Sequence, residues 1–194
     1  MANPRATDED LTAKARIRNT ALDLYARYGE DRISLRAVAS EAGVTLGLVQ
    51  HHFKTKAGLR DAVDQLVVDY FTEALRSVGG QSDSRRLAAA RDAAVTRMLH
   101  ENPPVVNYVR RALLQPCDEP THLLDVLIEL TREEVTTLRD EGMAPTDRPE
   151  PNQVVSVMVR QMGALLLQPL VDAAWDRVKS DNTPKPTLSI KVRD

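Results

Sequence analysis

The chain has 194 residues, of which 42% are hydrophobic and 28% are charged. That balance is typical of a globular protein and excludes a chain that is disordered throughout. The best apolar run, residues 163–171, includes Gln168 and Pro169 and is far shorter than the roughly 20 residues that cross a membrane. We therefore expect a globular protein with no membrane partner.

Charge is distributed unevenly along the chain, although the net charge is only −2. Residues 1–60 hold ten basic and seven acidic side chains, a net charge of +3, whereas residues 61–194 hold sixteen and twenty-one, a net charge of −5. A basic N-terminal part is the asymmetry expected of a head that contacts nucleic acid. The single Cys117 cannot form an internal disulfide, and no signal peptide is visible, so we expect a cytoplasmic protein.

The composition predicts an all-α protein, because Ala, Leu, Arg and Glu dominate and aromatic residues make up only 4%. Apolar residues at helical spacing, beginning with Ile17 and Ala21, predict a helix over residues 13–28. Gly29 stands where a glycine commonly ends a helix. The head is therefore expected to open with one long helix.

Two short helices are predicted next, separated by a tight turn. The first follows Ser34 and ends at Gly43, and the second is capped by Thr45 and extends to about His52. Two helices joined by so short a turn form a helix-turn-helix, in which the second helix enters the major groove of DNA.

The rest of the chain predicts a larger helical body. Apolar residues keep a helical rhythm for about five turns over residues 59–78. Further helices are expected at 84–101, 103–115, 121–140, 152–168 and 169–178. The predicted organisation is a DNA-binding head of residues 1–56, a helical body of residues 57–182 and a disordered tail of residues 183–194.

The second helix of the pair carries side chains suited to DNA. Gly47 lets the backbone approach base edges, and Gln50 can offer a donor and an acceptor to adenine. Leu46 and Leu48 can pack on thymine methyl groups. The flexible cations that suit phosphates follow directly, at Lys54 and Lys56.

These residues resemble a known family. Residues 42–56 read AGVTLGLVQHHFKTK and are followed by Leu59, which is similar to the signature of the TetR family of bacterial transcriptional regulators. Residues 21–29 and 33–39, ALDLYARYG and ISLRAVA, match the same pattern. The close resemblance covers about residues 13–60, and beyond it only the helical layout and the length are similar.

The resemblance implies a subunit of nine helices, a ligand-binding body and a homodimer held by the last two helices. It also implies a repressor that occupies a palindromic operator in double-stranded DNA and is released by a small, largely apolar effector. Residues implied to face bases or the groove are Arg36, Leu46, Gly47, Leu48, Gln50 and His51. Those implied to face phosphates are Ser34, Thr45, His52, Lys54 and Lys56.

One position departs from the family pattern. The family usually carries an aromatic residue, most often tyrosine, where this chain has Gln50. The phosphate contact of such a tyrosine is therefore in doubt, and a direct base contact by Gln50 takes its place as a hypothesis.

The helix over residues 59–78 joins head to body, so it is the element expected to transmit ligand binding.

Candidate residues of the body are less sharply marked, because periodicity does not separate a cavity lining from a packed core. The candidates for a ligand pocket are Met98, Tyr108, Leu127, Met158 and Met162. The candidates for a dimer interface are Val155, Val159, Leu166, Leu170 and Trp175. Trp175 can equally pack within one subunit.

Other chemistry finds little support in the sequence. His51 and His52 are adjacent on a helix and point about 100° apart, which disfavours a shared metal ion. We find no phosphate-binding loop, nucleophile elbow or metal-spaced cluster, so we expect neither an enzyme nor a cofactor. Two alternatives stay open: a DNA-binding dimer without a small-molecule ligand, and a helical carrier or enzyme that has lost DNA binding.

Overall fold

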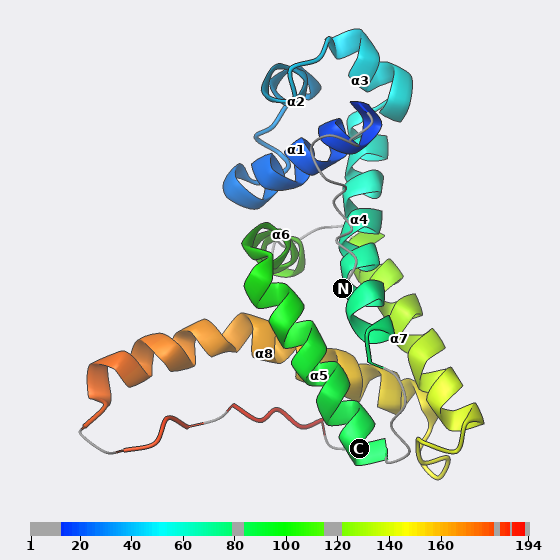
Figure 1. Cartoon of the computed structure of the whole chain (residues 1–194), viewed down its shortest axis with the longest axis vertical. Coiled ribbons are helices and arrows are strands. Elements are labelled where there is room, and N and C mark those ends of the chain that lie inside the picture. The colour runs from blue at the N-terminus through cyan, green and yellow to red at the C-terminus, as the bar shows by residue number, and fades with distance from the viewer. Residues whose placement is uncertain (1–12, 79–83, 115–121, 181–182, 187, 193–194) are drawn as a thin grey trace. The chain divides into compact units, whose positions relative to one another are not determined.

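The computed structural model describes residues 13–78, 84–114, 122–180, 183–186 and 188–192. In this part of the chain every regular element is a helix (Figure 1), which confirms the all-α prediction. The helices are α1 (Ala13–Tyr28), α2 (Leu35–Glu41), α3 (Leu46–Phe53), α4 (Lys56–Arg76), α5 (Ser84–Glu101), α6 (Pro103–Leu114), α7 (His122–Asp140) and α8 (Glu150–Val178).

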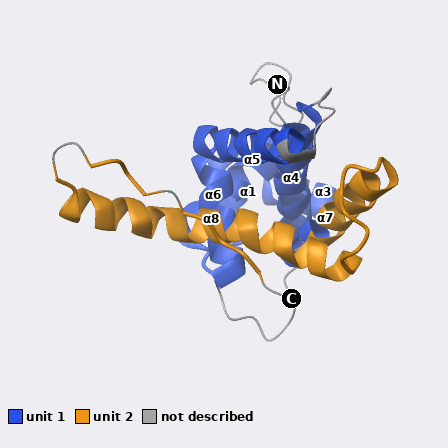
Figure 2. Ribbon diagram, turned by 90° about the horizontal axis from the view of Figure 1, so that it is seen from below, with its two compact units in different colours: residues 1–127 blue, residues 128–194 orange. Residues whose placement is uncertain are grey.

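The chain divides into two compact units, residues 1–127 and 128–194, with the boundary inside α7 (Figure 2). The first unit holds α1 to α6, and the predicted head of residues 1–56 lies within it. The second unit holds the rest of α7, α8 and the segment that follows α8.

The head has an apolar core that the first four helices share. Side chains from each of these helices are completely buried, among them Ile17, Leu22, Val38, Val49 and Leu59. Large apolar side chains removed from water contribute about 1.5–3 kcal/mol each, so this core holds the short helices α2 and α3 in place. Propensity alone would leave helices this short unstable.

α6 packs against α1 and ties the head to the rest of the first unit. Nε of Arg111 donates a 2.9 Å hydrogen bond to the carbonyl of Ala26, and Nη2 donates a 3.0 Å bond to the carbonyl of Arg27. The last carbonyls of a helix lack partners within the helix, and a cation is favoured there by the helix dipole. One side chain of α6 thus holds the end of α1.

The prediction of two final helices is wrong. One helix, α8, runs from Glu150 to Val178 with Pro169 inside it. Proline lacks the N–H of a helical hydrogen bond and usually bends or breaks a helix. Here Nε2 of Gln168 donates a 2.7 Å hydrogen bond to Oδ1 of Asp172, which bridges the turn around the proline. The described residues therefore form eight helices instead of nine.

α8 is more apolar than the sequence led us to expect. Its length and composition alone would let it cross a membrane, with a mean hydropathy of 1.5 over 18 residues of which 17% are buried. In the sequence, residues 163–171 form the best apolar run and are too short to cross a membrane. In the structure they belong to one continuous helix together with the apolar residues before them. A helix that packs against another subunit in a soluble protein has the same composition.

Candidate nucleic-acid interface

Three consecutive helices begin with a hydroxyl side chain that caps the helix. Oγ of Ser34 accepts from the N–H of Ala37 at 3.1 Å and opens α2, as predicted. Oγ1 of Thr45 accepts from the N–H of Leu48 at 3.2 Å and opens α3, also as predicted. A hydroxyl that accepts in a cap still has its own proton to donate, and phosphate oxygens accept such protons.

The turn between α2 and α3 depends on Gly43. Its φ is +65°, a conformation that side chains disfavour. The N–H of Gly43 donates to the carbonyl of Ser40 and the N–H of Val44 donates to the carbonyl of Ala39 at 2.9 Å. These two bonds end α2. Only Val44 separates Gly43 from Thr45, which caps α3, so the backbone of this turn sets the spacing of the two helices.

α3 has one buried face and one exposed face. Val49 is completely buried and Phe53 is buried at its end. Gly47, Gln50 and His51 are exposed, and their spacing of three and four residues puts them on one side of the helix. α3 therefore presents three of the predicted base-facing residues together while its opposite face anchors it to the head.

Three further predicted DNA-contacting residues lie on α3: Leu46 and Leu48, predicted to face the groove, and His52, predicted to face a phosphate. All three are half-buried, so each has part of its side chain against the head. The His51 and His52 rings meet edge to face with centroids 5.2 Å apart. Arg36 is exposed in the first turn of α2.

The two predicted phosphate cations differ in their surroundings. Lys54 is exposed at the end of α3. Lys56 is half-buried in the first turn of α4, and its Nζ lies 3.4 Å from the carbonyl of Asp31, to which it donates. Lys54 is therefore the more freely directed of the two cations.

The junction of α3 and α4 is a tight turn that the sequence analysis missed. Lys54 has φ +64° and ψ −59°, and the N–H of Thr55 donates to the carbonyl of Phe53 at 2.7 Å, which makes a γ-turn. Oγ1 of Thr55 then accepts from the N–H of Gly58 at 3.0 Å and caps α4. A Cβ on Gly58 would overlap the Phe53 carbonyl oxygen. The same Ser or Thr signal that located the caps of α2 and α3 would have found Thr55.

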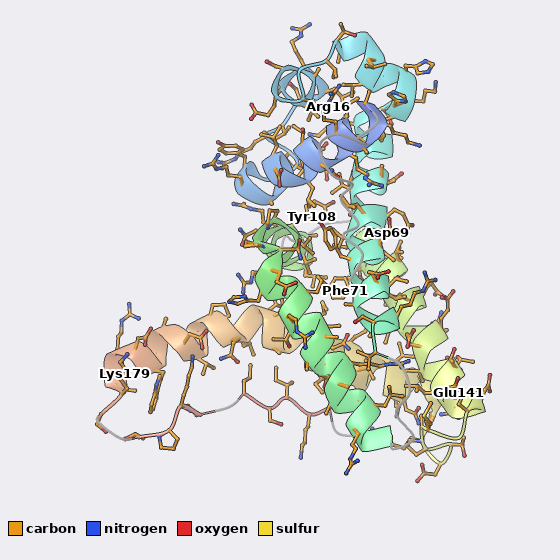
Figure 3. The ribbon with its side chains drawn as sticks, in the orientation of Figure 1. Arg16, Asp69, Phe71, Tyr108, Glu141 and Lys179 are labelled. Atoms are coloured by element: carbon orange, nitrogen blue, oxygen red, sulfur yellow. The ribbon has the colours of Figure 1, made fainter. Side chains whose placement is uncertain are left out.

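The predicted pocket residues fall in both units. In the first unit Met98, Tyr108 and Leu127 are buried, and in the second unit Met158 and Met162 are half-buried on α8. Tyr108 points from α6 toward α4 (Figure 3), where its hydroxyl donates to Asp64. Its ring stacks on that of Tyr25 with centroids 6.4 Å apart. Tyr108 thus packs between three helices of the first unit.

A hollow of about 410 Å³ lies elsewhere in the first unit, where α1, the end of α2 and the start of α6 meet. Polar side chains from α1 and α2 line it together with Pro103, Pro104 and Asn107. None of the predicted pocket residues contributes to it.

The predicted interface residues lie on α8. Val155 is 49% exposed, Val159 38% and Leu170 66%, whereas Leu166 and Trp175 are half-buried. Leu167 and Val178 are also exposed and were not predicted. Exposed large apolar side chains are thus concentrated on this helix.

Known proteins are similar to this chain chiefly in the head. Residues 17–63 match the family model of bacterial regulatory proteins, tetR family. The HTH-type transcriptional regulatory protein RaaS of Mycobacterium tuberculosis is 48% identical over 68 residues, which are 35% of this chain and 30% of that protein. The matched region therefore spans less than a third of this relative.

Solved structures share the fold over most of the chain. A tetR-family transcriptional regulator from Streptomyces coelicolor superposes with a TM-score of 0.62 at 22% identity, covering 84% of this chain and 71% of that one. FadR from Bacillus subtilis, solved with stearoyl-CoA, superposes with a TM-score of 0.66 at 13% identity, covering 83% and 89%. At these identities the likeness establishes the fold.

Proposed function

We propose that this chain, whose residues 17–63 match the family model of bacterial regulatory proteins, tetR family, is a DNA-binding transcriptional regulator of that family. In this proposal it acts as a cytoplasmic homodimer that represses by occupying a palindromic operator and leaves the operator when a small, largely apolar effector binds. It carries out no catalysis and needs no cofactor for this role.

The observation that carries the proposal is the exposed face of α3. Gly47, Gln50 and His51 stand out from a helix whose other face is locked into the head by Val49 and Phe53. The hydroxyl-capped starts of α2, α3 and α4 supply N–H groups and dipoles that favour phosphate oxygens on either side of a groove. Arg36 and Lys54 add exposed positive charge.

α8 supports the homodimer. Two heads must stand roughly 34–36 Å apart to enter successive major grooves on one side of DNA. Val155, Val159 and Leu170 expose apolar surface along α8 that water disfavours and a second copy would cover. A twofold pair of such helices uses the same patch on both subunits.

The contacts of α6 offer a route from effector to head. α6 holds the end of α1 through Arg111 and contacts α4 through Tyr108 and Asp64. α4 begins at the α3–α4 junction beside the proposed DNA-facing surface and also packs on α5. Because α6 contacts both α1 and α4, a shift of α6 acts on both of these helices. The effector releases DNA only if it binds the DNA-incompetent arrangement more tightly. The structure of FadR in complex with stearoyl-CoA shows that a protein of this fold can bind a small molecule with an apolar chain, in keeping with this proposal.

Fluorescence anisotropy with a mixed-sequence DNA duplex tests the DNA-binding claim. The wild-type chain should bind, with an affinity that falls steeply as salt rises, because bound phosphates release counterions. Arg36→Ala and Lys54→Ala should weaken binding while circular dichroism stays unchanged. If both variants keep full affinity, or if the wild-type chain fails to bind at low salt, DNA binding by this face is refuted.

A further inference from the structure

Residues 183–186 and 188–192 (the strap), which follow α8, end in an alternating pattern of exposed and half-buried side chains. Leu188, Ile190 and Val192 are half-buried, whereas Ser189 and Lys191 between them are exposed. A period of two is the pattern of an extended chain with one face against an apolar surface. The sequence predicts a disordered tail over residues 183–194, whereas the described part of this segment has one face against the protein.

Two contacts hold the strap along α8. Nζ of Lys185 lies 2.5 Å from Oδ1 of Asp172. Further along, the side chain of Ile190 covers Gly163, where a Cβ would overlap Cδ1 of the isoleucine and lie 3.7 Å from its Cγ1 and Cγ2. As the strap proceeds from 185 to 190 its contacts move back from 172 to 163, so it runs antiparallel to the helix.

Gly163 lies in the middle of the exposed apolar surface of α8. Val155, Val159, Gly163 and Leu167 (the α8 stripe) are spaced four residues apart and share one side of the helix. The three apolar side chains of the stripe are between 38% and 49% exposed. Glycine removes the side chain from the centre of this surface, and Ile190 occupies the space.

We propose that the strap covers Gly163, at the centre of the α8 stripe, in the single chain and competes there with a second copy of the same chain, whereas Val155, Val159 and Leu167 keep exposed apolar surface. The inference rests on the homodimer proposed above, which uses the same surface. Packed helices have axes about 8–10 Å apart, so a helix of a second copy and the Ile190 side chain cannot both lie over Gly163. Each chain must release its strap before the two stripes meet, and the strap therefore sets the concentration at which the regulator pairs.

Sedimentation equilibrium of the full chain tests the competition. Ile190→Ser removes the side chain over Gly163, and Lys191→Ser is the matched control because Lys191 is exposed on the other side of the strap. Ile190→Ser should lower the dimer dissociation constant about tenfold, since two chains each have a closed form to leave. Lys191→Ser should change it by less than about twofold.

Gly163→Ala is a second variant that tests the same competition independently. Its added methyl group displaces Ile190 and is small enough for a paired helix, so this variant should pair as tightly as Ile190→Ser. The double variant should gain nothing more, because the strap is already released. Trypsin should cleave the Lys191–Val192 bond faster in both single variants than in the wild-type chain, which reports release of the strap directly.

The outcomes separate the two proposals. A wild-type dimer whose dissociation constant is unchanged or raised by Ile190→Ser refutes the competition and leaves the homodimer intact. A chain that stays monomeric at every concentration, with or without Ile190→Ser, refutes the homodimer and the competition with it.

Discussion

The hydroxyl of Tyr108 donates a 2.6 Å hydrogen bond to Oδ1 of Asp64, 44 residues earlier in the chain. Both side chains are buried, and the bond joins α6 to α4. Burial raises the pKa of the Tyr108 phenol above its ordinary value, and the charge of Asp64 and the hydrogen bond to it raise this pKa further. The phenol therefore keeps its proton and remains a donor throughout the neutral range.

Tyr108→Phe removes this donor and keeps the ring. A buried carboxylate that loses a hydrogen-bond donor destabilises the fold by about 1–3 kcal/mol. We expect a lower urea midpoint with an unchanged slope, and a smaller loss when Asp64→Asn is already present. Equal losses in the two backgrounds would show that the pair does not act together.

Arg111→Lys tests the hold of α6 on the head. Lysine keeps the charge but cannot reach two carbonyls with a planar fork, so the bonds to Ala26 and Arg27 are not both replaced. We expect a destabilisation of about 1–2 kcal/mol and faster hydrogen exchange at the C-terminal end of α1. Unchanged exchange there would contradict the role given to Arg111.

Substitutions of Gln50 and Lys54 are predicted to change DNA binding in different ways. Gln50→Ala should flatten the preference among operator variants, with about 1–3 kcal/mol lost on the preferred base, because we propose that Gln50 faces the bases. Lys54→Ala should weaken all sequences alike and reduce the salt slope by about one, because we propose that Lys54 faces a phosphate. Titrations of single-base operator variants at two salt concentrations separate these effects. A uniform loss for Gln50→Ala would place Gln50 on the backbone instead.

The α3–α4 junction predicts a graded series of stabilities. Thr55→Ala loses the cap of α4 and should cost about 1 kcal/mol, whereas Thr55→Ser keeps the hydroxyl and should cost less. Gly58→Ala should cost more than either, because the new methyl group meets the backbone carbonyl of Phe53 and neither side can easily move. Thermal unfolding measures the series, and Gly58→Ala at wild-type stability would contradict the close approach.

Glu30 predicts a pH effect of definite sign. Burial raises the pKa of its carboxyl above the ordinary value of 4.5, although Arg60 and Lys56 act to lower this pKa. The folded chain then holds this proton more tightly than the unfolded chain does, so stability from Glu30 is lost as pH rises through the raised pKa. Glu30→Gln cannot ionise, so its melting temperature relative to wild type should be higher at about pH 7.5 than at about pH 4.5. A difference of the opposite sign would contradict the assignment.

Local signals located most of the helices and the turn that joins α2 to α3. Ser34, Gly43 and Thr45 are read correctly from sequence because a cap or a C-terminal glycine acts within three or four residues. Pro169 misled the prediction because a proline often ends a helix, whereas α8 continues through it and Nε2 of Gln168 donates to Oδ1 of Asp172 across that turn.

Relationships between distant residues were out of reach of the sequence. Tyr108 looked equally like a pocket or a core residue, since its partner Asp64 is 44 positions away. The strap carries few residues that favour structure by themselves, and its position depends on the space that Gly163 leaves on α8. Periodicity describes one segment at a time and does not say which other segment covers it.

Selection of bound sequences from a random duplex pool, at low and at moderate salt, is the decisive test of DNA binding by this chain. We predict enrichment of a palindrome whose half-site centres lie one turn apart, roughly 10–10.5 base pairs, with binding that falls steeply with salt. Recovery of no sequence above background at either salt concentration would contradict a DNA-binding regulator built on the exposed face of α3.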